Sequence, residues 1–269
     1  MFFFPGSQNQ YLLGFLHYSD KVPASTGIIY CHPFAEEKNM SHSVIAGASR
    51  QFASAGFPVM RFDFSGCGDS EGDLQSVVIE DWLDDLDAAV KIFRKETGVP
   101  RFLFWGLRMG AGLALLNTEL GKHDLCGLIL WQPVVDFTVH IAQFMRNLIS
   151  SEISRGIKSD TVTDPYKGLF RDGLVYVMGY PVSLRLYDSF RKIGSKPAKI
   201  IPPAPMLVLS VSVMEQPAFT IRKYVRRIEE AGISVDMRHL ISEPFWDRYW
   251  QWECKKAADI TLQWLHNFR

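Results

Sequence analysis

The sequence predicts a doubly wound α/β fold, in which helices cover both faces of a mostly parallel β-sheet. Short apolar runs that are typical of buried strands alternate with longer segments whose apolar residues recur at helical spacing. The chain has 269 residues, which suits one large α/β domain. Hydrophobic residues make up 47% and charged residues 22% of it, so the chain has enough apolar material to build a full core.

The first 136 residues supply an edge hairpin and four buried strands. The hairpin is expected over residues 2–17, because Pro5 interrupts this run and edge strands tolerate proline. A helix is expected over residues 41–55, where apolar residues follow helical spacing and Ser41 stands at the N-cap position. Compact apolar runs predict the buried strands at residues 27–31, 58–64, 101–105 and 126–131.

The helix expected from residue 79 has the clearest amphipathic pattern in the chain. Its apolar stripe consists of Ile79, Trp82, Leu83, Leu86, Val90 and Phe93. Acidic residues gather in its first half and basic residues near its end, which is the order that the helix dipole favours. We interpret the pair Asp84 and Asp85 as part of a solvated helix face rather than as a catalytic carboxylate pair.

Residues 137–197 interrupt the alternation of strands and helices. Their pattern is mixed and the segment is too long for a simple crossover, so we predict a mostly helical insertion that forms a lid over the cleft. Residues 1–136 and 198–269 then form the core of the fold. In its second part we expect strands at residues 205–210 and 233–239 and helices at residues 221–228 and 254–268.

The stretch after residue 101 has the pattern of a strand, a sharp glycine turn and a helix. Gly106-Leu-Arg-Met-Gly110 follows the expected strand, and small and apolar residues follow it. This is the context of the G-x-S-x-G nucleophile elbow, in which serine sits on a strained turn. Arg108 stands at the serine position, and arginine neither acts as an oxygen nucleophile nor deprotonates in proteins. The sequence therefore predicts the frame of a catalytic site without its usual nucleophile.

The order of these elements resembles the α/β-hydrolase fold along almost the whole chain. Several segments also resemble the hydrolase-like proteins associated with bacterial exosortase (PEP-CTERM sorting) systems. They are residues 30–38, 61–72, 106–110, 130–135 and 243–246. The resemblance implies a helical cap and a hydrolase acting on an ester, thioester or amide, associated with exopolysaccharide or exosortase functions.

The resemblance to α/β hydrolases also implies where a Ser-His-Asp triad should stand. Its nucleophile position is Arg108. Its acid should follow strand 205–210, where only Glu215 is near. Its histidine should follow the last strand, where Glu243 stands, whereas His239 is several residues early and is expected to be structural. Because all three positions depart from the pattern together, we predict that the ordinary serine-hydrolase reaction is not run.

Two interpretations of Arg108 stay open. Arg108 is predicted to pair with Glu243 across the cleft, because an unpaired buried charge costs several kcal/mol. Alternatively, Arg108 at the start of the elbow helix binds a carboxylate or phosphate of a small anionic ligand. His32 is either a base in this cleft or a residue that shapes its loop, with the N–H groups of Phe34 and Met109 left as a vestigial oxyanion hole.

Composition and motifs exclude several other functions. The net charge is zero, which gives no general reason to bind nucleic acid or an anionic membrane. No spacing suggests a metal site and no phosphate-cradling or dinucleotide motif is present, so we expect no metal and no cofactor. Cys67 has no histidine near it in sequence that could activate it as a nucleophile. No apolar run reaches about 18 residues, so we expect a cytoplasmic protein without a membrane span.

Two functions therefore remain open. In the first, the chain has a degenerate triad and binds a small anionic ligand or a protein partner in the lidded cleft. In the second, it is an active hydrolase of an ester, thioester or amide that uses a non-standard site. The candidate residues for either function are Arg108, His32, Phe34, Met109, Glu215 and Glu243.

Overall fold

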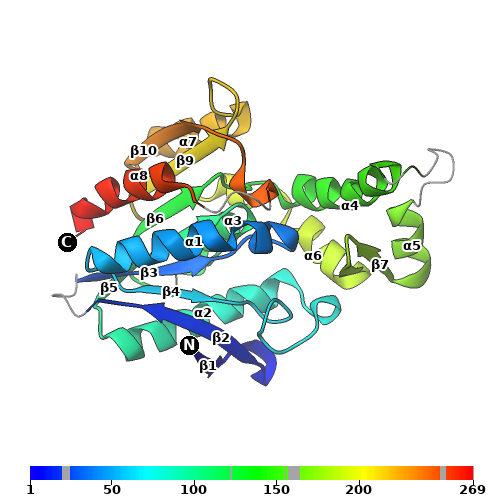
Figure 1. Cartoon of the computed structure of the whole chain (residues 1–269), viewed down its shortest axis with the longest axis horizontal. Helices are drawn as coiled ribbons and strands as arrows, with labels where there is room; N and C mark the ends of the chain where they lie inside the picture. Colours follow the sequence, from blue (N-terminus) through cyan, green and yellow to red (C-terminus); the bar gives the residue numbers. More distant parts are fainter. Residues whose placement is uncertain (20–24, 122, 155, 157–163, 249–252, 269) are drawn as a thin grey trace.

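A central eight-stranded sheet organises the computed structural model of the chain (Figure 1). The residues that the structure describes are 1–19, 25–121, 123–154, 156, 164–248 and 253–268. Across the sheet the strands lie in the order β1 (Phe2–Pro5), β2 (Tyr11–His17), β4 (Val59–Phe62), β3 (Thr26–Cys31), β5 (Arg101–Leu107), β6 (Leu125–Trp131), β9 (Met206–Ser212) and β10 (Val235–Ile241). The strands from β4 to β10 are parallel, whereas β2 pairs antiparallel with β1 and with β4.

Helices cover both faces of this sheet, and the predicted fold class is thereby confirmed (Figure 1). On one face lie α1 (Glu36–Ser54) and α8 (Lys255–Leu265). On the other face lie α2 (Ile79–Thr97), α3 (Met109–Glu119) and α7 (Phe219–Glu230). Successive strand residues alternate between the two layers, so Ile28 packs on the α1 side and Ile29 on the α2 side.

Helix α1 begins five residues earlier than the apolar pattern predicts. Its first turn holds Glu36 and Glu37, and polar residues there do not continue the apolar stripe. Ser41 is therefore not the N-cap, since its hydroxyl donates a hydrogen bond to the backbone oxygen of Glu37 inside the helix. The earlier start places Glu37 on a rigid helix beside the end of β5, where it becomes part of the site described below.

The prediction that Asp84 and Asp85 both lie on a solvated face of α2 is wrong for Asp85. Its side chain is fully buried, whereas Asp84 is exposed as expected. The two carboxylate oxygens of Asp85 accept hydrogen bonds at 2.8 Å from the backbone N–H groups of Ser7 and Ser65. Asp85 thus connects α2 to the N-terminal hairpin and to the loop that follows β4.

The described part of the segment between β6 and β9 contains helices and a small hairpin. The helices are α4 (Phe137–Ser154), α5 (Pro165–Asp172) and α6 (Leu184–Ile193), and the hairpin pairs β7 (Leu174–Val177) with β8 (Tyr180–Ser183). Helices α4 and α5 extend away from the central sheet (Figure 1). Phe144 of α4 packs against Phe34 of the core, so the segment contacts the loop after β3. The division of the chain into a core and a lid remains a prediction.

The described residues include neither a membrane-spanning helix nor a metal-binding cluster. Within them, no helix combines the length and the apolar character that a membrane span requires. The same residues contain no cluster of three or more His, Cys, Asp or Glu side chains placed to hold a metal ion.

Candidate functional site at the elbow

Arg108 occupies the sharp turn between β5 and α3. Its backbone has φ 55° and ψ −117°, a conformation that residues with a side chain rarely adopt. Neighbouring backbone groups hold the turn, because the Arg108 N–H donates to Trp131 and the Arg108 carbonyl accepts from Val134, each at 3.0 Å. The strained elbow predicted from the glycine pattern is therefore present, with arginine at its tip.

The elbow glycines are required by close backbone approaches. A Cβ atom at Gly110 would lie 2.1 Å from the carbonyl oxygen of Cys31, and one at Gly106 would lie 2.3 Å from the Cα atom of Ala111. No side chain fits at such distances, so these positions let α3 pack directly against the sheet. The side chain of Arg108 is thereby fixed at the carboxyl end of the strands, which is where ligands of such sheets bind.

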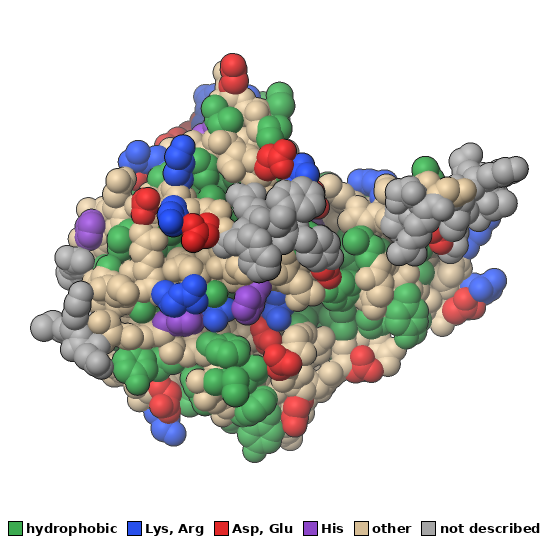
Figure 2. Space-filling view, in the orientation of Figure 1, with side chains coloured by type: hydrophobic (Ala, Val, Ile, Leu, Met, Phe, Trp, Pro, Cys, Tyr) green, Lys and Arg blue, Asp and Glu red, His purple; other side chains and the backbone are tan. Residues whose placement is uncertain are grey.

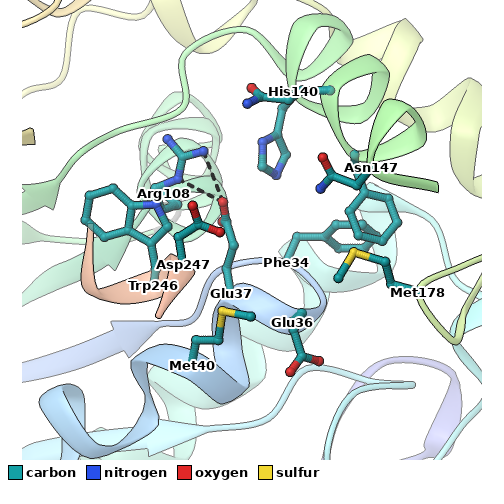
Figure 3. Close-up of a pocket in the computed structure, with 12 residues that line it drawn as sticks. Phe34, Glu36, Glu37, Met40, Arg108, His140, Asn147, Met178, Trp246 and Asp247 are labelled. Carbon is teal, nitrogen blue, oxygen red and sulfur yellow. Dashed lines mark hydrogen bonds and ion pairs between the residues drawn. The ribbon is translucent and has the colours of Figure 1, made fainter. Parts of the chain in front are cut away.

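Arg108 pairs with Glu37 of α1 (Figure 3). Its Nε and Nη2 atoms each lie 3.0 Å from the Oε1 atom of Glu37, and its guanidinium carbon lies 5.4 Å from the ring centroid of Trp246. The predicted pairing with Glu243 is wrong, because Glu243 is 52% exposed and pairs with Arg248 at 2.9 Å. The early start of α1 and the turn after β10 explain the difference, since they bring Glu37 and Trp246 to the elbow instead.

The carboxyl group of Glu37 is mostly buried beside Arg108. Burial raises the pKa of its carboxyl group, and the nearby charge of Arg108 opposes this shift. Its Oε2 atom is buried and has no hydrogen-bond partner among the described residues. One oxygen of this carboxylate therefore carries the ion pair, while the other has no donor among the described residues.

His140 of α4 approaches the same place from the other side. Its residue is 7% exposed, and its Nε2 atom is buried without a partner in the described chain. Burial, with a smaller contribution from Arg108, lowers the pKa of His140 to about 3, so the ring is neutral near pH 7. In Figure 3 the imidazole points from α4 toward the Arg108–Glu37 pair. Sequence reasoning assigned His140 no role, because it belongs to no motif and reaches the elbow only through the folding of residues 137–197.

These side chains line a cavity of about 190 Å³ between α1, α4 and the elbow. Its charged wall residues are Glu36, Glu37, Arg108 and Asp247. Its apolar wall includes Phe34, Met40, Phe144 and Trp246. The described residues that line it include no serine, threonine or cysteine. The cavity can therefore bind a molecule through polar and apolar contacts, but its wall supplies no hydroxyl or thiol nucleophile.

His32 lies outside this cavity and has both ring nitrogens occupied. Its Nε2 accepts from the Phe64 N–H at 3.1 Å, so its Nδ1 carries the proton and donates to the Pro33 carbonyl at 2.7 Å. Burial lowers its pKa to about 4, which keeps the ring neutral near pH 7. His32 lines a separate hollow of about 350 Å³ together with Arg61. Figure 2 shows Lys, Arg and His side chains gathered near the middle of the face in view. Neither nitrogen is available to take a proton in the Arg108 cavity.

The other predicted site residues are placed as follows. Glu215 is exposed in the loop after β9 and does not line the cavity. His239 lies inside β10, where its Nε2 is 2.9 Å from the Met214 carbonyl oxygen. Phe34 lines the cavity, and Met109 is buried at the first position of α3, where a helix leaves its N–H groups without intrahelical partners.

Cys67 is held in its protonated form. Burial raises the pKa of its thiol to about 12. The nearby charge of Lys38 lowers this pKa slightly, and the charges of Asp63 and Asp85 raise it slightly. A thiol rather than a thiolate is a weak nucleophile near pH 7. Cys67 is also absent from the wall of the Arg108 cavity.

Comparisons with known proteins agree with this architecture. Residues 24–172, more than half of the chain, match the family model described as serine aminopeptidase, S33. No curated protein shows a significant match in sequence.

Solved structures of several hydrolases share the fold over almost the whole chain. A thermostable carboxyl esterase from Bacillus coagulans has a TM-score of 0.68 at 14% identity, covering 99% of this chain and 97% of that one. Est1E from Butyrivibrio proteoclasticus, solved with ferulic acid bound, has a TM-score of 0.67 at 13% identity, covering 99% and 100%. A proline iminopeptidase from Mycobacterium smegmatis has a TM-score of 0.61 at 14% identity, covering 99% and 97%. At these identities the similarity establishes the fold alone.

Proposed function

This chain belongs to the serine aminopeptidase S33 family, and we propose that it binds a small molecule in the cleft of that fold without running serine-hydrolase chemistry. The observation that carries the proposal is the elbow itself. The nucleophile position holds Arg108, which is ion-paired to Glu37 and cannot attack a carbonyl. An ordinary triad reaction also needs a base beside the nucleophile, and the loop after the last strand supplies Glu243 instead of histidine.

We propose that the ligand is a small molecule rather than a protein segment. The cavity of about 190 Å³ is smaller than the roughly 300–1,000 Å³ typical of pockets for drug-sized molecules. The segment 137–197 acts as its lid in this proposal, because α4 contributes His140 and Phe144 to the wall. The anionic ligand expected from Arg108 alone is less favoured, since Glu37 already neutralises that charge.

We also propose that the chain works beside an exosortase (PEP-CTERM) sorting system. The support is the resemblance of its segments to the hydrolase-like proteins of such systems, above all residues 106–110 and 130–135. In a host that has such a system, deletion of the gene is expected to alter the sorting of the PEP-CTERM proteins or the exported polysaccharide. Unchanged sorting and polysaccharide in the deletion strain would argue against this role.

A fluorophosphonate probe and a panel of p-nitrophenyl esters test the absence of serine-hydrolase chemistry. We expect labelling and turnover no higher than those of heat-denatured protein, because the described residues of the cavity wall offer no hydroxyl or thiol. The Bacillus coagulans esterase serves as a positive control with the same fold. Probe labelling at any residue of the cleft would overturn the proposal. Turnover of an ester, thioester or amide without labelling would support a hydrolase with a non-standard site.

A further inference from the structure

Two side chains on the wall of this cavity each have a buried polar atom without a hydrogen-bond partner among the described residues. These atoms are Oε2 of Glu37 and Nε2 of His140, which come from α1 and α4. Beside them stands the guanidinium of Arg108, which has five N–H donors, and Glu37 takes bonds from two of its three nitrogens. Figure 3 shows these three side chains converging. Native proteins pair nearly all of their buried polar groups, so these two atoms and the remaining Arg108 donors are hydrogen-bonding positions that a bound molecule can fill.

The ion pair disfavours a charged ligand of either sign. An anion placed on Arg108 would lie next to the Glu37 carboxylate, which is 3.0 Å from that guanidinium. A cation placed on the free oxygen of Glu37 would lie next to Arg108 for the same reason. Two further carboxylates lie on the wall: Glu36 accepts a hydrogen bond from the Tyr180 hydroxyl at 2.6 Å, and Asp247 is exposed to solvent, which screens its charge. An uncharged ligand leaves the pair intact.

We propose that the cavity binds an uncharged carboxamide attached to an apolar ring or chain. The amide oxygen accepts a hydrogen bond from Arg108, and the two amide hydrogens are donated to Oε2 of Glu37 and to Nε2 of His140. The apolar part of the ligand lies against Phe34 and Trp246 on the cavity wall. This inference rests on the proposed function, because it names the ligand class of a cleft that binds without acyl transfer.

Acid should change the preference of the cavity in a defined direction. The charged and titratable groups that face Glu37 are Arg108 at the elbow, Glu36 on its own helix, Asp247 in the turn after β10 and His140 on α4. Burial raises the pKa of Glu37, so its carboxyl takes up a proton at a higher pH than an exposed glutamate. Once Glu37 is neutral, Arg108 loses the carboxylate with which it is paired, and a carboxylate ligand gains affinity as the pH falls.

Three ligands of nearly equal shape test the inference with the full chain. Benzamide, benzoate and benzylamine differ mainly in charge, and their binding is measured by isothermal titration calorimetry at about pH 7.5 and about pH 5. We expect benzamide to bind about tenfold more tightly than either ion at the higher pH, a difference of about 1.4 kcal/mol. Benzoate is expected to gain affinity severalfold at the lower pH, while benzamide changes less than about twofold.

Substitutions at Glu37 and His140 test which side chains cause the preference for benzamide. In Glu37→Gln the negative charge is absent, so benzoate is expected to bind more tightly than benzamide. The matched control is Glu215→Gln, an exposed acid that does not line the cavity, which should keep the preference for benzamide. His140→Phe removes one acceptor and should weaken benzamide about tenfold without favouring benzoate. If Glu37→Gln fails to fold, the double variant Arg108→Gln, Glu37→Gln preserves the charge balance and should lose the discrimination between the three ligands.

The outcomes separate this inference from the proposed function. Benzoate or benzylamine binding as tightly as benzamide at the higher pH, or no binding of any of the three, overturns the carboxamide assignment and leaves the absence of acyl transfer untouched. Fluorophosphonate labelling overturns both. Retention of the benzamide preference in Glu37→Gln also overturns the assignment, because it removes the role of the ion pair.

Discussion

The pair formed by Arg108 and Glu37 is the residue-scale feature on which the site depends. Each side chain is mostly withdrawn from water, with 18% and 23% of its surface exposed. Replacing either residue leaves the charge of the other poorly solvated and unpaired, whereas replacing both leaves no unpaired charge. The energy of the pair is therefore visible only when the single and double variants are compared.

A double-mutant cycle with Arg108→Gln and Glu37→Gln measures that energy. Each single variant is expected to lower the free energy of unfolding by about 2 kcal/mol, and the double variant by less than the sum, because charge-assisted hydrogen bonds contribute about 1.5–3 kcal/mol. Urea unfolding gives the values. The exposed pair Arg248 and Glu243 is the matched control and should show a coupling of about 1 kcal/mol or less. Equal coupling in the two pairs would contradict a special role for the elbow pair.

The sequence predicted one member of the elbow pair but not the other. Arg108 was identifiable because the strand, the glycines and the helix fix its place through local chain geometry. Glu37 was not, because its position depends on where α1 begins, and polar residues in a first turn leave the apolar pattern unchanged. His140 was missed for a different reason, since only tertiary packing of the inserted segment carries it to the elbow.

At the scale of the element, α2 illustrates a buried acid that sequence patterns misplace. Asp85 lies next to the exposed Asp84 in an acidic run, so the local sequence indicates solvent. The structure instead buries Asp85 between backbone donors of the N-terminal hairpin and the loop after β4. A carboxylate that caps backbone N–H groups gives no periodic signal, because its partners lie 78 and 20 residues away in the chain.

Asp85→Ala is expected to lower the free energy of unfolding by about 3 kcal/mol, because two buried backbone donors lose their acceptor. Asp84→Ala is the control and should change it by about 0.5 kcal/mol or less, as is usual for an exposed position. Chemical unfolding followed by circular dichroism measures both. Similar losses in the two variants would show that Asp85 does not connect these elements.

The hairpin of β7 and β8 offers a stabilising substitution. Val177 pairs with Tyr180, so Met178 and Gly179 form a two-residue loop, and both have positive φ, of 50° and 88°. Such loops favour Asn-Gly, so Met178→Asn is expected to stabilise the chain by about 0.5–1 kcal/mol. Gly179→Ala should destabilise it, because alanine disfavours positive φ. A fall in melting temperature for Met178→Asn would contradict this turn assignment.

At the scale of the whole molecule, buried neutral histidines make stability depend on pH. Burial lowers the pKa of His32 to about 4 and that of His140 to about 3, while an unfolded chain binds these protons near pH 6.5. Between these values the unfolded state holds more protons than the folded state. Stability from these groups is therefore complete above about pH 6.5 and is lost as the pH falls.

We expect each of the two histidines to add about 1.4 kcal/mol per pH unit to the loss of unfolding free energy below about pH 6. Urea unfolding at several pH values between about 7 and 5 measures the slope. In the variant His140→Phe the free energy of unfolding should fall less steeply with decreasing pH, by about 1.4 kcal/mol per pH unit, because one titrating group is absent. Parallel pH profiles for the parent chain and the variant would show that His140 does not need to stay neutral for folding.

The fold as a whole was more predictable than the site. Alternation of apolar strands and amphipathic helices is a property of the sequence itself, and the central strands and α2 follow it closely. The inserted segment was harder, since β7 and β8 are only four residues each and give too short a pattern to distinguish from a helix. The residue at which a helix begins depends on capping and packing, as α1 demonstrates. The cavity wall includes the start of α1, so its residues were equally hard to predict from the sequence.

The described walls of the Arg108 cavity come from five separate parts of the chain: the start of α1, the elbow, α4, the turn between β7 and β8, and the turn after β10. No fragment of the polypeptide contains all of them, so recognition of a ligand requires the finished tertiary structure. A bound molecule therefore stabilises the whole native state. It adds about 2.7 kcal/mol to the free energy of unfolding when its concentration is about a hundred times its dissociation constant. Occupancy of this cavity can therefore serve as a readout of how much of a preparation has reached the native state.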